Sequence, residues 1–409
     1  MVGVVHGKVS RQDVGEHLDE LNLLAETAGA NVSGRIIQNL NRINPKYFLG
    51  KGKAEQVISQ AKELKVNLII FDEDLTPAQV KNYMDLTDDI KIIDRSALIL
   101  DIFKQHAQSR ESKTQVEMAY YQYLLPRLTH QWTHLERQMG GIGTRAGMGE
   151  TQIEVDRRII RTKIAKLKKD LERIEKERST QAHKRRTEFR TALVGYTNAG
   201  KSTLFKCMTG SDVFIQDQLF ATLDTTIRRI QLGDTHTCLI SDTVGFIRKL
   251  PHHLVASFRS TLKEVLEADL LIIVLDISSP FLKDHLKTID EVLKDLDAEK
   301  IPRLIVLNKA DLVQDVEQIS SSINSFPDSI AVSALESLRI DQLKNKILEI
   351  MEQNFQTIEV EVSYKNGKIV SESQEGVVVL NREYLETGVK LTIRGSRRRI
   401  EQIQSSLPT

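Results

Sequence analysis

Short apolar runs alternate with segments of helical periodicity over the first part of the chain. Apolar side chains recur every three or four positions in residues 13–30, which predicts an amphipathic helix. Residues 66–72 (VNLIIFD) form a continuous apolar run typical of a buried strand. Thr76 and Gln79 stand at capping-box spacing, so a helix is expected to begin there. Strands alternating with helices predict an N-terminal α/β domain with a parallel sheet over residues 1–108.

Residues 109–188 carry two long helical stripes. The first consists of Met118, Tyr121, Leu125, Leu128, Trp132, Leu135 and Met139. The second consists of Ile160, Ile164, Leu167, Leu171 and Ile174. Matching stripes favour antiparallel packing, so we expect a helical hairpin with a kink or late start at Pro126. The glycine-rich stretch MGGIGTRAGMGETQ (residues 139–152) separates the stripes and is expected to form the tip of this hairpin.

The rest of the chain divides into two further regions. Residues 189–355 again alternate apolar strands with helical segments, which predicts a mostly parallel sheet with helices on both faces. Residues 356–409 alternate apolar and polar positions in stretches such as VKLTIRG and end on a basic, helix-like segment. The predicted fold class is multidomain α/β, with a helical hairpin and a small, strand-rich α+β domain at the C-terminus.

Composition narrows the class of protein. A chain of 409 residues is too long for a single core. Its apolar runs, such as residues 270–277, are too short to cross a bilayer, and its N-terminus lacks the apolar region of a signal peptide. The two cysteines, Cys207 and Cys238, lack metal-ligand spacing and fit a reducing compartment. We therefore expect a cytoplasmic protein without stable membrane insertion.

The net charge of +1 conceals an uneven distribution. Residues 157–190 hold more Lys and Arg than Asp and Glu. Two interpretations stay open, because a charged run can be a solvated helix face or a basic ridge that contacts nucleic-acid phosphates.

A phosphate-binding motif lies at residues 195–202 (GYTNAGKS). A short apolar strand precedes it, and the sequence matches the pattern G-x-x-x-x-G-K-[ST]. Glycines allow backbone N–H groups to surround a phosphate, Lys201 supplies positive charge, and the Ser202 hydroxyl can ligate Mg²⁺. The glycine-rich stretch 139–152 has no such lysine and no preceding strand, so it is not the phosphate site.

Two further motifs select the nucleotide. The segment LISDTVGF reads as a strand that ends in Asp242-Thr243-Val244-Gly245. Asp242 can hold Mg²⁺ through water, and the Gly245 N–H can meet a γ-phosphate. Asp311, in NKAD, can accept hydrogen bonds from the N1–H and N2–H groups of guanine, which adenine lacks. The backbone at Ser333 and Ala334 can reach guanine O6. These motifs predict a P-loop GTPase domain that binds GTP and GDP.

The segment FATLDTTIRR (residues 220–229) occupies the place of the first switch, the loop that senses the γ-phosphate. A threonine there completes the Mg²⁺ shell, and Thr222, Thr225 and Thr226 are all available. The residues expected to bind the nucleotide are Gly195, Tyr196, Thr197, Asn198, Ala199, Gly200, Lys201, Ser202, Thr203, Phe220, Ala221, Thr222, Leu223, Asp224, Asp242, Thr243, Val244, Gly245, Asn308, Lys309, Ala310, Asp311, Ser333, Ala334 and Leu335.

The combination of GYTNAGKS, FATLDTT, DTVGFI and NKAD, preceded by GGIGTRAGMGETQIEVDRR, resembles the HflX family of translational GTPases. The resemblance extends to RINPKYFLGKGKAEQV and covers nearly the whole chain. It implies that Thr222 joins Ser202 and Asp242 at Mg²⁺. It also implies a GTPase that binds rRNA of the large ribosomal subunit and splits or rescues stalled ribosomes under stress. One departure is Ala-Gly-Met at residues 146–148, where Gly-Pro-Gly is expected.

The catalytic group stays unknown. Many GTPases orient the attacking water with a glutamine after D-x-x-G, and here that position is Phe246. Lys201, Asn198 and Gly245 can support the transition state, and Asn198 can also hold K⁺ in the role of an arginine finger. We expect slow intrinsic turnover that the ribosome stimulates.

The residues expected to contact the ribosome are Gly143, Arg145, Gly147, Arg157 and Arg158. Off the ribosome we expect a monomer. Two alternative functions stay open: a ribosome-assembly GTPase, and a nucleotide-switched module that docks a protein on the hairpin.

Overall fold

The computed structural model describes the chain in ten stretches and groups it into two compact units. The described residues are 1–7, 9–128, 152–182, 188–210, 219–233, 236–249, 262–313, 315–353, 355–363 and 377–406. The first unit contains Met1–Ile174, Gln216–Asp224 and Lys249–Arg259, and the second contains Glu175–Ile215, Thr225–Arg248 and Ser260–Thr409. The first unit thus includes two short segments from the region expected to form the GTPase domain. The expected four-domain boundaries stay a prediction.

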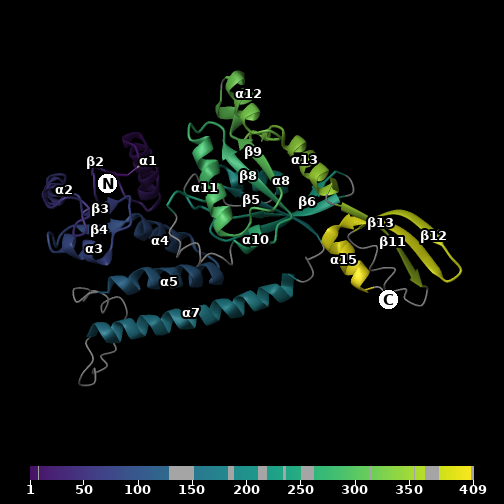
Figure 1. Ribbon diagram of the computed structural model, residues 1–409, viewed down its shortest axis with the longest axis horizontal. Coiled ribbons are helices and arrows are strands. Elements are labelled where there is room, and N and C mark those ends of the chain that lie inside the picture. Colours follow the sequence, from purple (N-terminus) through teal and green to yellow (C-terminus); the bar gives the residue numbers. More distant parts are fainter. Residues whose placement is uncertain are drawn as a thin grey trace. The chain divides into compact units, whose positions relative to one another are not determined.

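A four-stranded parallel sheet forms the core of the first unit (Figure 1). Its strands, in the order β2-β1-β3-β4, are β1 (Val2–Val5), β2 (Ile36–Asn39), β3 (Leu68–Phe71) and β4 (Lys91–Asp94). Its helices are α1 (Arg11–Thr27), α2 (Lys51–Glu63), α3 (Pro77–Met84) and α4 (Arg95–His106). Helix α3 begins with the predicted capping box, in which the Thr76 hydroxyl accepts from the Gln79 N–H. The predicted parallel sheet is confirmed, although the short first strand does not stand out in the sequence.

The helical hairpin packs two long helices antiparallel. It consists of α5 (Arg110–Leu124), the 3₁₀ turn η1 (Leu125–Arg127) and α7 (Gln152–Ala182). Leu124, Leu128 and Ile160 are almost fully buried in one cluster, and Lys163 on α7 donates to the Tyr121 hydroxyl at 3.1 Å. Helix α5 ends at Leu124, two residues before Pro126, because proline cannot donate a backbone hydrogen bond. The stripe residues beyond Leu128, and the hairpin tip, lie outside the described residues.

A six-stranded sheet organises the second unit, in the order β10-β9-β8-β5-β7-β6. Its strands are β5 (Phe189–Gly195), β6 (Thr226–Leu232), β7 (His236–Asp242), β8 (Leu270–Asp276), β9 (Arg303–Asn308) and β10 (Ile330–Ala331), and only the edge strand β6 is antiparallel to its neighbour. Its helical elements are α8 (Lys201–Thr209), α10 (Lys263–Leu266), α11 (Leu282–Asp295), η3 (Ala310–Leu312), α12 (Val316–Ser325) and α13 (Ile340–Gln353).

Helices cover both faces of this sheet, as the sequence predicted. Helices α8 and α13 share one apolar core, into which β5 directs Leu193. Its neighbours Ala192 and Val194 are equally buried, and because side chains alternate along a strand they face the other side of the sheet. Helix α11 packs there, against β5 and β8. The chain therefore has the mostly parallel, two-sided architecture of a P-loop GTPase domain.

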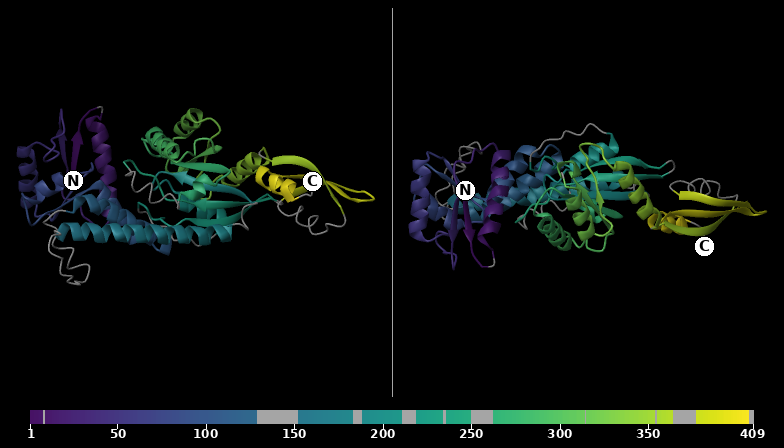
Figure 2. Two further views of the ribbon diagram at one scale, coloured as in Figure 1. Left: turned by 60° about the horizontal axis from the view of Figure 1, so that its bottom comes forward. Right: turned by 90° about the horizontal axis from the view of Figure 1, so that it is seen from above.

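The C-terminal part of the second unit is a small antiparallel sheet with one helix. Its elements are β11 (Phe355–Ser363), β12 (Val377–Tyr384), β13 (Gly388–Ser396) and α15 (Arg397–Ser406), with strand order β11-β13-β12. Ile400 and Ile403 of α15 pack against Leu391 and Ile393 of β13, so the helix covers one face of the sheet (Figure 2). The predicted strand-rich C-terminal unit is confirmed.

In the part of the chain that the structure describes, none of the helices combines the length and the apolarity that crossing a bilayer requires.

Candidate nucleotide site

Four predicted motif segments converge at the carboxyl edge of the six-stranded sheet. Residues 195–203 follow β5, residues 242–245 follow β7, residues 308–311 follow β9 and residues 333–335 follow β10. Because β5, β7, β9 and β10 are parallel, their carboxyl ends meet at one edge of the sheet. In open α/β sheets, ligands bind at this edge.

The P-loop is a tight turn whose shape depends on Gly200. This residue has a φ of +86°, and a Cβ there would lie 2.2 Å from Nδ2 of Asn308, so only glycine fits. Lys201 follows it at the start of α8, and its ammonium group donates to the carbonyl oxygens of Gly195 at 3.1 Å and Tyr196 at 2.8 Å. These bonds point the lysine back across the loop that precedes it.

Burial changes the chemistry of Lys201. The side chain is 6% exposed, and desolvation lowers its pKa to about 8, although the nearby Asp242 carboxylate favours the charged form. A phosphate group would add negative charge beside the ammonium and raise this pKa again. An anion bound beside Lys201 would therefore compensate the ammonium charge in place of the water that burial excludes.

The donor set around Ser202 fits Mg²⁺. The Ser202 hydroxyl donates to Oδ2 of Asp242 at 2.6 Å, and Asp242 is fully buried at the end of β7. Mg²⁺ is a hard cation that prefers oxygen ligands and binds proteins through one or two side chains together with phosphates and water. The described residues contain no cluster of three or more His, Cys, Asp or Glu side chains that could hold a metal, so the nucleotide and water would complete the shell.

Asn308 connects the P-loop to the segment after β10. Its Nδ2 donates to the carbonyl oxygen of Ala199 at 3.0 Å, and its Oδ1 accepts from the N–H of Ala334 at 3.0 Å. Ser333, which is fully buried, donates its hydroxyl hydrogen bond to the Asp311 carboxylate. Asp311 is thereby held in one orientation, as reading the edge of a guanine ring requires.

The residue in the usual glutamine position cannot reach a nucleotide. Phe246 is 1% exposed, so its side chain is part of the core. Its backbone bonds to the P-loop, because its N–H donates to Gly195 at 3.0 Å and its carbonyl oxygen accepts from Thr197 at 2.8 Å. Thr197 is 7% exposed, and its hydroxyl has no hydrogen-bond partner among the described residues.

The first half of the expected first switch, residues 220–224, belongs to the first compact unit, and residues 225–229 belong to the second. Phe220 is 3% exposed, and its ring meets Phe103 of α4 edge to face, with 4.6 Å between the centroids. The carboxylate of Asp224 accepts from the N–H groups of Gln108 at 3.0 Å and Ser109 at 3.1 Å, and from the Ser109 hydroxyl at 2.5 Å. Since Ser109 is the N-cap of α5, Asp224 places a negative charge at the start of the hairpin.

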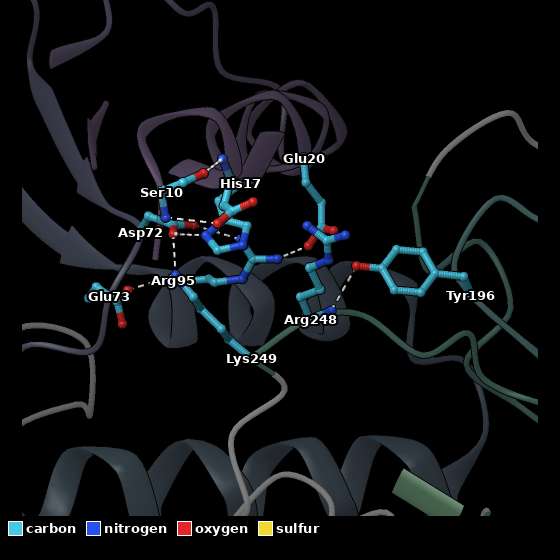
Figure 3. Close-up of polar contacts among 10 residues, drawn as sticks. Ser10, His17, Glu20, Asp72, Glu73, Arg95, Tyr196, Arg248 and Lys249 are labelled. Carbon is cyan, nitrogen blue, oxygen red and sulfur yellow. Dashed lines mark hydrogen bonds and ion pairs between the residues drawn. The ribbon is translucent and has the colours of Figure 1, made fainter. Parts of the chain in front are cut away.

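The sequence DTVGFIRKLP (residues 242–251) is expected to form the second switch, and its residue Lys249 belongs to the first unit. Its ammonium group donates to Asp72 at 2.5 Å and to Glu73 at 2.7 Å, at the carboxyl end of β3 (Figure 3). Asp72 is 2% exposed and also accepts from Arg95 at 2.8 Å, and Arg95 pairs in turn with Glu20. Lys249 therefore adds positive charge to a buried ionic cluster in the N-terminal unit.

Comparison with known proteins decides the family. Three family profiles match in order: "GTP-binding GTPase N-terminal" over residues 15–104, "GTP-binding GTPase Middle Region" over residues 106–185, and "50S ribosome-binding GTPase" over residues 190–309. GTPase HflX of Flavobacterium psychrophilum is 50% identical over 76% of this chain and 75% of its own length. The chain belongs to the HflX family of GTPases.

Two further proteins are similar over most of the chain. GTPase HflX of Escherichia coli is 43% identical over 82% of this chain and 79% of its own length. A crystal structure of SsGBP in complex with GDP is 27% identical, with a TM-score of 0.46, and the match covers 86% of this chain and 98% of that one. Membership of the HflX family makes this chain a GTP-binding protein and a GTP hydrolase.

The structure brings together most of the residues predicted for nucleotide binding in this HflX GTPase. Those from the four edge segments lie within the second unit, whereas Phe220, Ala221, Thr222, Leu223 and Asp224 are grouped with the first unit. Of the expected ribosome contacts, Arg157 and Arg158 lie on α7 with exposed side chains. Gly143, Arg145 and Gly147 lie outside the described residues.

Sequence reasoning missed the partners of the switch segments. Phe103, Ser109 and Asp72 are distant in sequence from the motifs they contact, and no local pattern connects them. The position of Asp72 directly after a buried apolar strand was the one available signal, since acidic residues there lie at the functional edge of a sheet.

The bonds of Asp224 predict a pH-dependent contribution to stability. Burial by itself raises its pKa, but hydrogen bonds from Ser109, Ser112 and Gln108 outweigh burial, and the net pKa lies below its ordinary value. A carboxylate with a lowered pKa stabilises the fold above its unfolded pKa of about 4, and this stability is lost as the pH falls through the folded value. Asp224→Ala should therefore destabilise the first unit by about 1–2 kcal/mol at pH 7 and by less at pH 3.

Urea denaturation, with hydrogen exchange at the first-turn amides of α5, measures this effect. Asp88→Ala removes an exposed carboxylate from the same unit and should change neither readout. This role of Asp224 would be contradicted if Asp224→Ala lowered the free energy of unfolding by the same amount at pH 7 and at pH 3.

Proposed function

We propose that this HflX GTPase binds the large ribosomal subunit and uses GTP binding and hydrolysis to dissociate or rescue stalled ribosomes under stress. The observation that carries the proposal is the basic surface of α7. Its exposed basic residues are Arg157, Arg158, Arg161, Lys166, Lys168, Lys169, Arg173 and Lys176. Such a surface suits rRNA phosphates. The profile described as a 50S ribosome-binding GTPase, which matches residues 190–309, supports the same partner.

The nucleotide would bind at the carboxyl edge of the six-stranded sheet. The N–H groups of the P-loop and the N-terminus of α8 would surround the phosphates, and Lys201 would compensate their charge. Asp311 would accept hydrogen bonds from the guanine N1–H and N2–H groups. The Ala334 N–H, which donates to Oδ1 of Asn308 in the structure, would have to turn to O6 when guanine binds. Adenine carries neither donor, so ATP would cover the Asp311 carboxylate without supplying these two hydrogen bonds, which disfavours ATP binding.

Ser202 and Asp242 would hold Mg²⁺, with Thr222 from the first switch as the expected third protein residue. The ion would supply positive charge that compensates the phosphates of the nucleotide. The Gly245 N–H would meet the γ-phosphate. Because the buried Phe246 side chain can neither donate nor accept, the position after D-x-x-G does not supply the usual water-orienting group. We infer a slow intrinsic rate that a bound ribosome raises by ordering the switches.

The switch contacts support a working cycle. Phe220 packs against Phe103, and Asp224 accepts a hydrogen bond from Ser109 at the start of the hairpin. Lys249 forms an ion pair with Asp72 of the ionic cluster in the first unit. Reordering of the switches by GTP would therefore change bonds made by the N-terminal unit and by α5. We infer that this change is how nucleotide state reaches the surface that contacts rRNA.

Substituting the guanine-reading carboxylate tests the nucleotide site. Asp311→Asn should weaken GTP and GDP binding by about 100-fold or more, because an amide cannot accept from both guanine donors. Xanthosine nucleotides carry a carbonyl at C2, so their affinity should rise. Fluorescent-nucleotide titration measures both, with the exposed Asp328→Asn as a control expected to bind like the native chain. Unchanged GTP affinity would remove Asp311 from the site.

Neutralising the basic surface of α7 tests the partner. Arg158→Gln/Arg161→Gln should weaken binding to large ribosomal subunits by about 10-fold and reduce its salt dependence, since fewer counterions are released. Co-sedimentation with a non-hydrolysable GTP analogue, at several salt concentrations, measures this. Lys294→Gln/Lys300→Gln removes equal charge from exposed positions elsewhere and should bind normally. Equal sedimentation with GDP and with the analogue would contradict a GTP-dependent cycle.

The position of Asn198 in the P-loop motivates a test of monovalent cations. Its side chain is exposed, and its φ is +59°. We propose that Asn198 helps to hold K⁺ near the β- and γ-phosphates, in place of an arginine finger. Basal GTP hydrolysis should be faster in KCl than in NaCl at equal ionic strength, and Asn198→Ala should abolish the difference. Equal rates in the two salts would exclude the cation.

A further inference from the structure

Tyr196 occupies the first variable position of the P-loop, yet its side chain turns away from the phosphate loop. It is 5% exposed, and its ring stacks on His285 of α11 with 4.0 Å between the centroids and 14° between the planes. Neighbouring rings in proteins usually prefer offset or edge-to-face arrangements. A nearly parallel stack this close fixes the direction of the tyrosine hydroxyl.

That hydroxyl bonds to the backbone of the expected second switch. It accepts a hydrogen bond from the backbone N–H of Arg248 at 2.8 Å (Figure 3). Arg248 stands two residues after Phe246, whose own backbone bonds to Gly195 and Thr197. The chain from Phe246 to Arg248 is thus attached to the P-loop by backbone bonds at one end and by the Tyr196 side chain at the other.

The first turn of α11 completes this attachment. The Arg248 guanidinium lies 5.8 Å from the centre of the Phe281 ring and 3.8 Å from the Asp284 carboxylate. Burial, with the neighbouring positive charge of Arg248, lowers the pKa of His285 to about 4, although the carboxylates of Asp276 and Asp284 favour the charged form. His285 is therefore a neutral ring at physiological pH, and a single helical turn supports both Tyr196 and Arg248.

The result of this attachment is a fixed distance between the second switch and the P-loop. A Cβ on Gly245 would lie 2.8 Å from Cγ2 of Thr197 and 3.0 Å from Nζ of Lys201, so the switch backbone has no spare room there. Since Phe246 carries no polar side chain, only backbone groups can contribute to catalysis at this position. Backbone groups stabilise a transition state only when they are held in place beforehand.

We propose that Tyr196 and His285 are positioning residues for GTP hydrolysis, which together hold the second switch at a fixed distance from the P-loop. The pair touches neither the phosphates nor the attacking water. It acts through the backbone of residues 245–248. The inference rests on the proposed phosphate-binding role of the P-loop, and it extends that role to the buried Tyr196 side chain, which packs against α11.

Conservative variants separate positioning from binding. Tyr196→Phe keeps the ring and removes the acceptor for the Arg248 N–H, so kcat should fall by about 3- to 10-fold, the equivalent of one net hydrogen bond. GTP KM and GDP affinity should stay within about 2-fold of the native values, because no phosphate contact is lost. His285→Ala should reproduce this loss, and His285→Phe, which restores a stacking ring, should recover most of the native kcat.

The double variant tests whether the two residues act as one. Tyr196→Phe/His285→Ala should lower kcat no further than the stronger single variant, since both remove the same constraint. As a control, Tyr83→Phe removes the hydroxyl of a buried tyrosine in the first unit. This variant should hydrolyse GTP at the native rate.

Three outcomes would overturn the proposal: an unchanged kcat in Tyr196→Phe, a higher kcat, or a parallel loss of kcat and nucleotide affinity. An absence of GTP binding in the native chain would instead refute the proposed nucleotide site.

Discussion

The side-chain amide of Asn308 is the interaction on which the nucleotide site depends. It bonds to the carbonyl of Ala199 in the P-loop and to the N–H of Ala334 after β10, so one residue sets the spacing between the phosphate end and the base end of the site. The same amide occupies the space that a side chain at Gly200 would need. The two residues therefore have to be considered together, because a larger residue at one leaves no place for the other.

The chain from Phe246 to Lys249 is attached at both ends. Phe246 and Arg248 bond to the P-loop in the second unit, and Lys249 bonds to Asp72 and Glu73 in the first unit. A buried ionic pair gains little net stability, but removing one partner leaves a buried charge without compensation. Loss of the Lys249 ammonium would therefore remove compensating charge from the buried Asp72 carboxylate.

The sequence predicted that the motif segments lie at one edge of the sheet, but it did not predict the contacts that connect these segments to other elements. The P-loop, the D-x-x-G segment and NKAD follow strands at fixed spacing, and parallel strands bring such segments to one edge, so their convergence could be inferred from pattern alone. The stack of Tyr196 on His285 could not, because it depends on how α11 packs against β5. The contact of Phe220 with Phe103 was equally hidden, since both residues resemble ordinary core positions. Residues 139–152 lie outside the described residues, so their assignment to a hairpin tip stays a prediction.

The carboxylate of Asp224 has a thermodynamic consequence of its own. It belongs to the loop expected to respond to GTP, and its hydrogen bonds stabilise the start of α5. Linkage is reciprocal: if nucleotide changes the affinity of the hairpin for a partner by some factor, that partner changes the affinity for nucleotide by the same factor. If nucleotide binding changes the affinity of the hairpin for RNA as proposed, RNA bound to the hairpin would change the affinity for guanine nucleotides by the same factor, without approaching the nucleotide itself.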